Sequence, residues 1–330
     1  MKAVQMTATG GPEVLQPLDL PEPQLHSPSG IKVRVKAAGI NPVDTKLRGR
    51  GLFYPDALPA ILGLDGAGVV EAVGAEVARF RPGDEVWYCN GGLGGEPGNY
   101  AEYHIVDEAV AQPKPESIDF TRAAAAPLVL LTAYEALFDR AGMREGRTVL
   151  VHAGAGGVGH VAIQLAKIAG ARVITTVSTE EKADFVRSLG ADAVVNYKEH
   201  ELLDAVMEWS GGRGVDIALD TVGPETLKAS IPVVAHYGDL VTLLDPGAVE
   251  WKEARNRNLR IGFELMLTPL LSDLPEARAH QGEILRQCAE WIDAGRLRID
   301  VGGTYPLEQA AAAHRLVEDG HVQGKLVLTM

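Results

Sequence analysis

The chain has 330 residues, of which 46% are hydrophobic and 23% charged, and its formal net charge is −13. This length predicts two domains, each large enough to bury its own core. The acidic balance disfavours a nucleic-acid partner, because phosphate backbones are bound by clustered Lys and Arg. Cys89 and Cys288 are too few for a disulfide framework or a cysteine-rich zinc site, so we expect free thiols.

Neither a signal peptide nor a membrane span is expected. The N-terminus MKAVQMTATGGPEV has no apolar core, and the longest apolar stretch, 123–138, is interrupted by Pro127 and too short to cross a bilayer. The sequence therefore predicts a soluble, cytoplasmic protein without membrane contact.

The first 120 residues have the pattern of strands and turns. Apolar or alternating runs at 1–6, 31–40 and 67–74 are separated by the turn sequences TGGPE, SPSG and RPGD. These features predict a β-rich domain. From about residue 121 the pattern becomes helical, with a break at Pro127.

The next hundred residues alternate short apolar strands with helices, which predicts βαβ units and a parallel sheet. The expected strands are 148–153, 171–177, 193–197, 215–222 and 239–244, and the expected helices are 160–169, 180–189, 199–209 and 224–234. This part of the chain is predicted to be a doubly wound α/β domain.

The stretch HAGAGGVGH, residues 152–160, lies between the first of these strands and its helix. Gly154, Gly156 and Gly159 fit the pattern G-x-G-x-x-G, which in this context is typical of a dinucleotide site. Gly154 would permit the tight turn, Gly156 the approach of the backbone to a diphosphate, and Gly159 the packing of helix on strand. A plain tight turn is the alternative. His152 and His160 have no partner at metal-ligand spacing and are expected to be structural.

The end of the second strand of this domain indicates which nicotinamide is preferred. An NAD site usually carries Asp or Glu there, but the sequence has Ser178, followed by Lys182, which suit a 2′-phosphate. Tyr197 follows the third strand and would close over the same end. Ser178 and Glu181 would also form a capping box, and an inward-facing Glu180 or Glu181 would repel a phosphate. We expect NADPH.

The whole chain resembles the medium-chain dehydrogenase/reductase superfamily. The segments AAGINPVDTKLRGRG, LPAILGLDGAGVVEAVG, LVLLTAYEAL, VLVHAGAGGVGHVAIQLAK and VQGKLVLTM carry the resemblance, which is nearest to the zinc-independent quinone oxidoreductases, the ζ-crystallin-like proteins. It implies a GroES-like β-rich catalytic domain over 1–122, completed by 273–330. A Rossmann NADP-binding domain would span 123–272, with cofactor and substrate in the cleft between the domains.

The sequence differs from the zinc alcohol dehydrogenases of this superfamily at their zinc-binding positions, and these differences indicate a reaction without zinc. Asn41 stands where those enzymes have a zinc-binding Cys, and their Gly-His-Glu motif is replaced by Gly63, Leu64 and Asp65. The proton-relaying hydroxyl is replaced by Val43. Without thiolate and imidazole no tetrahedral zinc site is expected, and the Lewis acid needed for alcohol oxidation is lost.

The resemblance also implies the site residues. Those around the nicotinamide and diphosphate would be Asn41, Thr132, Gly154, Gly156, Gly157, Val158 and Gly159. Those at the adenosine end would be Ser178, Lys182 and Tyr197. Further contacts would come from Val222, Leu244, Phe263, Leu265 and Lys325, although the apolar members of this set could equally be core residues. Tyr54 matches a tyrosine at the substrate mouth and would donate or orient a proton, unless it only packs its loop. Asp44 and Arg48 are expected to organise their own loop.

These features predict an NADPH-dependent reductase of quinones or α,β-unsaturated carbonyls. The alternative is an NADPH-binding, crystallin-like or RNA-associated protein with little turnover, and the acidic charge disfavours its RNA-binding form. A homodimer joined through Rossmann-edge strands is implied by the family, with 260–267 as the candidate edge, unless this segment is an ordinary buried strand.

Overall fold

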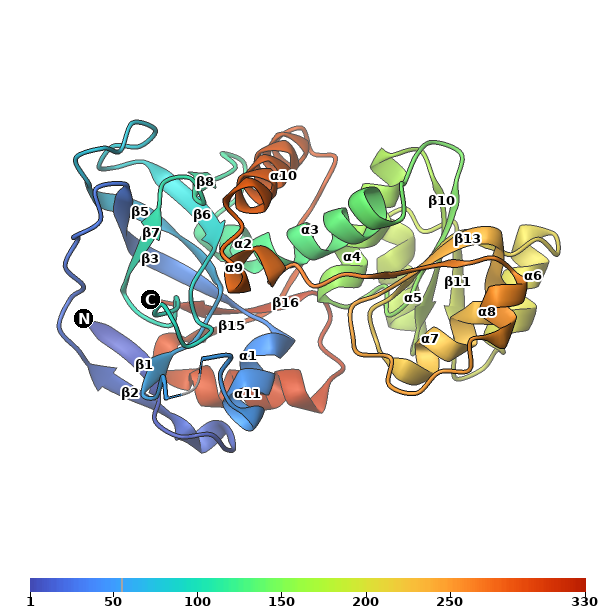
Figure 1. Ribbon diagram of the computed structural model, residues 1–330, viewed down its shortest axis with the longest axis horizontal. Helices are drawn as coiled ribbons and strands as arrows, with labels where there is room; N and C mark the ends of the chain where they lie inside the picture. Colours follow the sequence, from blue (N-terminus) through green and yellow to red (C-terminus); the bar gives the residue numbers. More distant parts are fainter. Residues whose placement is uncertain (55) are drawn as a thin grey trace. The chain divides into compact units, whose positions relative to one another are not determined.

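The computed structural model describes residues 1–54 and 56–330, which form two compact units (Figure 1). Unit 1 comprises Met1–Leu128 and Thr268–Met330, and unit 2 comprises Val129–Leu267. The C-terminal segment thus completes the N-terminal domain. The domain borders predicted at 122/123 and 272/273 lie a few residues from these divisions.

Unit 1 is built on two sheets. The smaller has the order β2-β1-β4, and the larger the order β15-β16-β3-β5-β6-β8 with β7 also paired to β3. All neighbouring strands are antiparallel except β15 and β16. The strands are β1 (Lys2–Met6), β2 (Leu15–Asp19), β3 (Gly30–Ile40), β4 (Ala60–Ile61), β5 (Asp65–Val73), β6 (Glu85–Cys89), β7 (Tyr103–Asp107), β8 (Gln112–Pro113), β15 (Val301–Pro306) and β16 (Lys325–Thr329).

The α-helices of unit 1 are α1 (Pro42–Arg50), α2 (Phe120–Ala125), α9 (Thr268–Leu271), α10 (Pro275–Asp293) and α11 (Ala310–Asp319). Helix α1 begins directly after the long strand β3, and it contacts α11 from the C-terminal segment (Figure 1). Side chains from opposite ends of the sequence therefore meet along α1.

Unit 2 is a parallel sheet with the order β11-β10-β9-β12-β13-β14. In chain order this is 3-2-1-4-5-6, the strand order of the doubly wound dinucleotide-binding fold, as the sequence predicts. The strands are β9 (Thr148–Val151), β10 (Arg172–Val177), β11 (Ala193–Asn196), β12 (Val215–Asp220), β13 (Val234–Thr242) and β14 (Arg260–Phe263).

The helices of unit 2 are α3 (Pro127–Tyr134, which begins at the division between the units), α4 (Gly157–Ile168), α5 (Glu180–Ser188), α6 (Leu202–Ser210), α7 (Pro224–Ser230) and α8 (Lys252–Asn256). A π-helical turn, Glu135–Arg140, continues α3. The break at Pro127 is confirmed, because α2 ends at Ala125. The helix expected over 224–234 ends earlier, and β13 begins at Val234. No helix of the described residues is long and apolar enough to cross a membrane.

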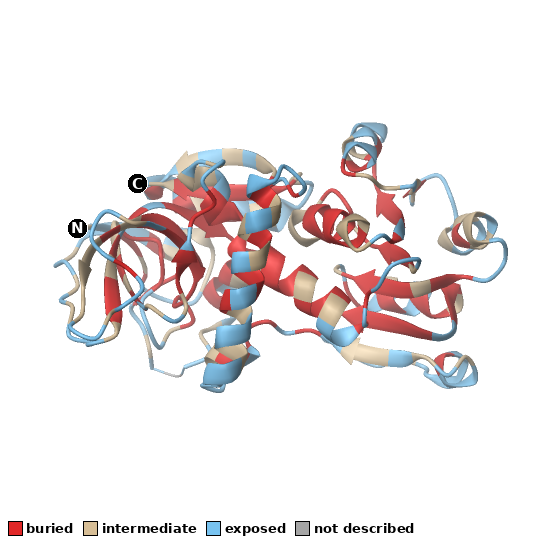
Figure 2. Cartoon of the chain, turned by 90° about the horizontal axis from the view of Figure 1, so that it is seen from above, coloured by how far each residue is buried: buried red, intermediate tan, exposed pale blue. Residues whose placement is uncertain are grey.

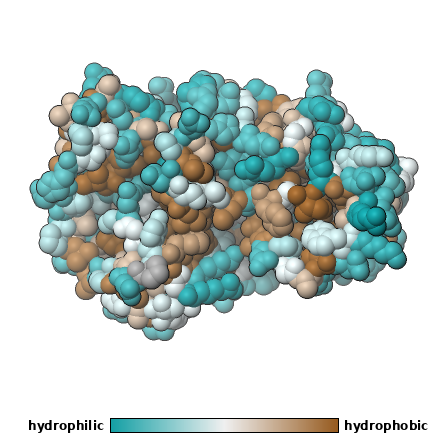
Figure 3. Space-filling view, viewed as in Figure 1, coloured by the Kyte–Doolittle hydropathy of each residue, from teal (hydrophilic) through white to brown (hydrophobic). Residues whose placement is uncertain are grey.

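The cores follow from these patterns. The inner strands of unit 2, β10, β9, β12 and β13, are mostly buried, as apolar runs in a parallel sheet require, whereas the edge strands β11 and β14 are partly exposed (Figure 2). On the face drawn in Figure 3 the surface is mostly hydrophilic, and apolar side chains gather in separate patches.

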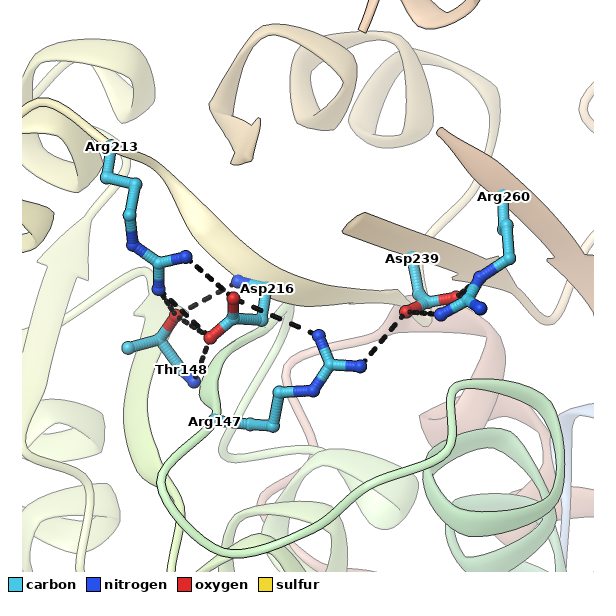
Figure 4. A network of polar contacts seen from close by, with 6 residues as sticks. All are labelled: Arg147, Thr148, Arg213, Asp216, Asp239 and Arg260. Carbon is cyan, nitrogen blue, oxygen red and sulfur yellow. Dashed lines mark hydrogen bonds and ion pairs between the residues drawn. The ribbon is translucent and has the colours of Figure 1, made fainter. Parts of the chain in front are cut away.

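A charged network closes the amino edge of the parallel sheet (Figure 4). Asp216 accepts hydrogen bonds from the backbone N–H and hydroxyl of Thr148, at 2.8 and 2.9 Å, and from Arg213 at 2.8 Å. Asp239 binds Arg260 on the edge strand β14 through both oxygens, at 2.6 and 2.7 Å, and Arg147 lies between the two carboxylates. Ligands of such sheets bind at the opposite, carboxyl edge, which these side chains leave open.

Candidate active site

The glycine turn follows β9 at this carboxyl edge. Ala153 has φ +49° and is the left-handed residue of the turn. Gly154 is needed for a different reason, because a Cβ there would lie 2.1 Å from Thr175 Oγ1. At Gly159 a Cβ would lie 2.2 Å from the carbonyl oxygen of Ala153. Both glycines let the turn and α4 pack closely on the sheet.

Gly156 differs from its neighbours. A Cβ at this position would meet only one atom, the Ala153 carbonyl oxygen at 3.2 Å, so the space above it is open. Gly156 is also the N-cap of α4, which starts at Gly157 and Val158. The first amides of a helix have no acceptor within it, and the helix dipole favours an anion there. The turn therefore fits a diphosphate.

The two histidines of the turn lie in the core. His152 Nε2 is 2.8 Å from Ser230 Oγ, and burial lowers the pKa of His152 to about 4. His160 Nδ1 lies 3.1 Å from the Gly156 carbonyl oxygen. These hydrogen-bonded, buried positions are those expected for structural histidines.

Ser178 and Tyr197 leave the sheet side by side. Val177 pairs with Asn196 in the parallel register, and the Tyr197 N–H donates to the Val177 carbonyl oxygen at 3.1 Å. The predicted capping box of Ser178 and Glu181 is wrong. Thr179 is the N-cap of α5, and its hydroxyl accepts from the Lys182 N–H at 3.3 Å. The Ser178 hydroxyl therefore does not cap α5.

The charges on the first turn of α5 are unevenly paired. Glu180 is bound by Arg187 at 2.6 Å, which neutralises one of the two carboxylates that would repel a phosphate. Within residues 1–54 and 56–330, Lys182 forms no ion pair, and its side chain is partly exposed. A lysine without an ion-pair partner, close in sequence to Ser178, can bind the 2′-phosphate of NADPH.

Apolar side chains are exposed at the carboxyl edge of the sheet. Val222 is 52% exposed, Phe263 57% and Leu265 51%, while Leu244 is half-buried. The turn before Val222 is held by Asp220, whose Oδ1 accepts from the Val222 N–H at 3.0 Å. Exposure on this scale argues against a core role for the three residues and is compatible with a wall for a flat ring.

The other predicted residues lie elsewhere. Thr132 is buried in α3 of unit 2, whereas Asn41, Tyr54 and Lys325 belong to unit 1. Tyr54 is 41% exposed, and its ring lies beside Gly95 in the loop after β6.

Asn41 and Lys325 meet in a fully buried cluster with Asp65, which we call the Asn41 cluster. Lys325 Nζ donates to the Ile40 carbonyl oxygen at 2.7 Å and also to Asn41 Oδ1, and it lies 3.8 Å from Asp65 Oδ2. Asn41 Nδ2 donates to the same carboxylate oxygen at 2.9 Å. Both ends of the Asn41 amide are therefore occupied by protein partners. Asp65 Oδ1 accepts from the Leu128 N–H at 2.8 Å.

Burial dominates the protonation of this cluster. It raises the pKa of Asp65, opposed by Lys325 and by hydrogen bonds from Asn41 and Leu128, and it lowers the pKa of Lys325, opposed mainly by Asp65. Cys89 is paired with Asp65 across β5 and β6, and burial raises the pKa of its thiol well above the ordinary range. The Lys325 side chain therefore lies beside Asp65, which stands at the Glu position of the Gly-His-Glu motif.

The donor set does not suit zinc. Zinc sites use thiolate, imidazole or carboxylate, and the cluster offers one carboxylate, one amide and one ammonium. Among the described residues no group of three or more His, Cys, Asp or Glu could hold a metal ion.

Sequence reasoning missed Tyr100 and His314 and underestimated Asp44. Asp44 Oδ2 accepts from the Asn41 N–H at 2.8 Å in a capping box, so Asp44 does organise the start of α1. It also accepts from the Tyr100 hydroxyl at 3.3 Å, and that hydroxyl lies 3.1 Å from His314 Nε2. No sequence pattern links positions 44, 100 and 314, because tertiary packing alone brings them together.

Two protein families match the chain, one in each half of the sequence. Residues 27–116 match the alcohol dehydrogenase GroES-like domain family, and residues 189–328 match the family described as zinc-binding dehydrogenase. The chain is 36% identical to a quinone oxidoreductase of Pseudomonas aeruginosa over 331 residues, which cover 99% of both proteins.

Solved structures are similar over the full length. One is the quinone oxidoreductase of Escherichia coli complexed with NADPH, with a TM-score of 0.89, 32% identity and full coverage of both chains. Another is described as an NAD-dependent alcohol dehydrogenase, with a TM-score of 0.90, 35% identity and the same coverage. The chain belongs to the medium-chain dehydrogenase/reductase superfamily and, within it, to the quinone oxidoreductase branch of NAD(P)H-dependent oxidoreductases.

Proposed function

We propose that the protein is an NADPH-dependent reductase of quinones or α,β-unsaturated carbonyls. The observation that carries the proposal is the edge formed by Ser178, Lys182 and Tyr197. It offers a hydroxyl and an unpaired ammonium where an NAD site usually has a carboxylate. The relative complexed with NADPH supports the same cofactor.

Different residues of unit 2 would bind different parts of this cofactor. The amides of Gly157 and Val158 would receive the diphosphate above Gly156, and Ser178 and Lys182 would receive the 2′-phosphate. The remaining predicted contacts, which are apolar or near the nicotinamide, are Thr132, Val222, Leu244, Phe263 and Leu265. When bound, NADPH supplies a hydride.

The buried cluster of unit 1 favours an acceptor that is already polarised. Lys325 and Asn41 are held in place by each other, by Asp65 and by the Ile40 carbonyl oxygen, so they present fixed dipoles rather than a Lewis acid. Such preorganised dipoles can stabilise developing negative charge but do not lower the pKa of an alcohol as a Lewis acid does. Tyr54, exposed in its loop, is proposed to orient the acceptor.

Acceptor specificity can be measured directly. Initial rates of NADPH oxidation are compared for quinones, enones, acrylates and enoyl thioesters, with NADH in parallel. We expect turnover of at least one of the first two classes and a higher kcat/KM for NADPH. NADPH binding without oxidation by any acceptor would instead support the binding-only, crystallin-like alternative.

Cofactor choice has its own test. Lys182→Glu should lower the ratio of NADPH to NADH efficiency about 10-fold or more, because a charge-assisted contact of about 1.5–3 kcal/mol becomes repulsive. Lys228→Glu makes the same change of charge on α7 and serves as the control. An unchanged ratio in Lys182→Glu would remove the assignment of the 2′-phosphate to this edge.

We further propose a homodimer formed through β14. Among the described residues this strand pairs with β13 alone and is the last strand of the sheet, so its outer backbone groups are available to a second copy. The Glu264 N–H donates to the Thr242 carbonyl oxygen on β13, so by the alternation of the strand the Ile261 N–H faces the outer edge. Sedimentation of the purified protein tests this assembly: the wild type should sediment as a dimer and Ile261→Pro, which removes an outer N–H, as a monomer. A monomeric wild type, or an unchanged dimer in Ile261→Pro, would contradict it.

A further inference from the structure

Three buried side chains of unit 1 form a continuous hydrogen-bonded chain that the proposed reaction has not used. It runs from Asp44 on α1, through the Tyr100 hydroxyl, to His314 on α11. All three residues have 0% exposure. The chain begins next to Asn41, whose N–H donates to Asp44 Oδ2 at 2.8 Å. It therefore connects the Asn41 cluster to the contact between two helices.

The packing around Tyr100 holds its hydroxyl in place. A Cβ at Gly63, where φ is +96°, would lie 2.4 Å from the Tyr100 ring, so only glycine leaves room for the ring. The Tyr100 and His314 rings meet edge to face with centroids 5.7 Å apart. The Tyr100 N–H also donates to the Leu62 carbonyl oxygen at 3.0 Å. The hydroxyl thus has a fixed position between its two partners.

Each end of this chain has an unused polar atom. Among the buried side-chain atoms of the described residues, Asp44 Oδ1 and His314 Nδ1 have no hydrogen-bond partner. Buried polar atoms are nearly always paired, so two orphans in one chain need an explanation. Because one is a carboxylate oxygen and the other a ring nitrogen, each can hold or release a proton.

The surface side of the chain is also charged. Arg48, one turn after Asp44 on α1, is buried and pairs with Glu318, one turn after His314 on α11. The Glu318 side chain is 40% exposed, so this pair connects the α1–α11 contact with solvent.

We propose that His314, Tyr100 and Asp44 relay a proton from the α1–α11 contact to the Asn41 cluster. That this proton is the one consumed when the acceptor is reduced rests on the proposed function. The relay itself needs no cofactor.

The proton count is balanced at each step. In the first state Asp44 is ionised, Tyr100 donates to Asp44 Oδ2, and His314 Nε2–H donates to the Tyr100 oxygen. A proton that binds His314 Nδ1 releases the Nε2 proton to Tyr100, which passes its own proton to Asp44. In the second state Asp44 is a carboxylic acid and His314 is neutral with its proton on Nδ1. After Asp44 loses its proton, the Tyr100 hydroxyl turns back toward Asp44 Oδ2. His314 then gives up the Nδ1 proton and takes up one proton at Nε2, an exchange with no net gain of protons that restores the first state.

The electrostatic surroundings favour this direction. Burial raises the pKa of Asp44 to about 7, while burial and the nearby Arg48 lower the pKa of His314 to about 3. A proton that enters at His314 is therefore held on Asp44. The ionisable groups facing Asp44 are Lys325, Asp65, Cys89 and Tyr100, and those facing His314 are Tyr100 and Arg48.

The test without cofactor is the tautomer of His314. In the ¹⁵N NMR spectrum of the uncomplexed protein, assigned by loss of the signal in His314→Gln, His314 should remain neutral from pH 5 to 9. Its proton should move from Nε2 at high pH to Nδ1 at low pH, as Asp44 is protonated. Tyr100→Phe should abolish this change. A single tautomer throughout in the wild type, or an unaltered change in Tyr100→Phe, would overturn the relay.

Tyr88 provides the matched control. Its hydroxyl is also fully buried and has no partner among the described residues, but it lies outside the chain. Tyr88→Phe should leave the tautomer change of His314 intact, so a loss of that change in Tyr100→Phe would not come merely from removing a buried hydroxyl. The unfolding midpoint of Tyr100→Phe itself shows whether that variant is folded.

Turnover gives a second, separable readout. Tyr100→Phe should lower kcat for NADPH-dependent reduction about 10- to 100-fold and remove the solvent isotope effect, while KM for NADPH stays unchanged. Tyr88→Phe should change neither. If no acceptor is reduced, the proposed function fails and the NMR result still decides the relay. If kcat in Tyr100→Phe equals the wild-type value, the relay does not supply the reaction.

Discussion

Two Gly-to-Ala substitutions in the glycine turn should have different effects. One should weaken NADPH binding, and the other should lower the free energy of unfolding. In Gly156→Ala the added Cβ meets only the Ala153 carbonyl oxygen, at 3.2 Å, and the backbone has an ordinary φ of −80°. In Gly159→Ala it lies 2.2 Å from that oxygen and 2.8 Å from Gly154 Cα, both of which are backbone atoms. The first variant fills the space predicted for the diphosphate, and the second forces α4 away from the turn.

The expected magnitudes differ accordingly. Gly156→Ala should weaken NADPH binding about 10- to 100-fold, because losing a charge-assisted contact with a phosphate costs about 1.5–3 kcal/mol. Its unfolding free energy should change by less than about 0.5 kcal/mol. Gly159→Ala should lose about 1–3 kcal/mol of unfolding free energy through overpacking, even without cofactor.

Fluorescence titration with NADPH and denaturant unfolding of the uncomplexed protein measure the two effects. Gly49→Ala, in α1 of unit 1 with no atom near its Cβ, is the control for a harmless added methyl group. Wild-type NADPH affinity in Gly156→Ala would refute the placement of the diphosphate above this residue. A fully stable Gly159→Ala would refute the packing argument.

Three further predictions concern other parts of the chain. Burial raises the pKa of Asp216, but hydrogen bonds from Arg213 and Thr148 outweigh it and hold that pKa at about 2. Asp216→Asn should therefore lose about 1 kcal/mol at pH 7, after allowance for solvent screening, and the loss should shrink below pH 3.8 in urea unfolding. Burial lowers the pKa of His104 from 6.5 to about 4. Between these two pH values only the unfolded chain gains the proton at this residue, so the free energy of unfolding falls as the pH drops below 6.5. His104→Phe should flatten that slope in thermal melts. Tyr54→Phe should raise KM for quinones and leave NADPH affinity unchanged, and equal KM values would remove its proposed role.

Much of unit 2 follows from the sequence. Its inner strands β9, β12 and most of β13 are buried, so they appear as apolar runs, and the glycine pattern marks the turn after the first strand. The start of β13 was misplaced because Ile231–Val233 forms a 3-10 turn that leads directly into the strand. The capping box was misassigned because Ser178 and Thr179 are both good caps, and only the backbone shows which of them precedes the helix.

The unit 1 cluster could be predicted only in part. Asn41 and Asp65 stand in the two segments that, by the family resemblance, differ from the zinc alcohol dehydrogenases, which marks them in the sequence. Their pairing with Lys325 depends on the antiparallel contact of β16 with β3, between the two ends of the chain. The Asp44–Tyr100–His314 chain has no local signal, because its three members come from α1, a loop and α11.

The most direct test of the proposed activity is oxidation of NADPH by the chelator-treated protein with a quinone and an enone. We expect one NADPH consumed per acceptor reduced, with deuterium from C4-labelled NADPH recovered on carbon of the reduced enone. Turnover that appears only after zinc is added, or NADPH that binds without reducing any acceptor, would contradict it.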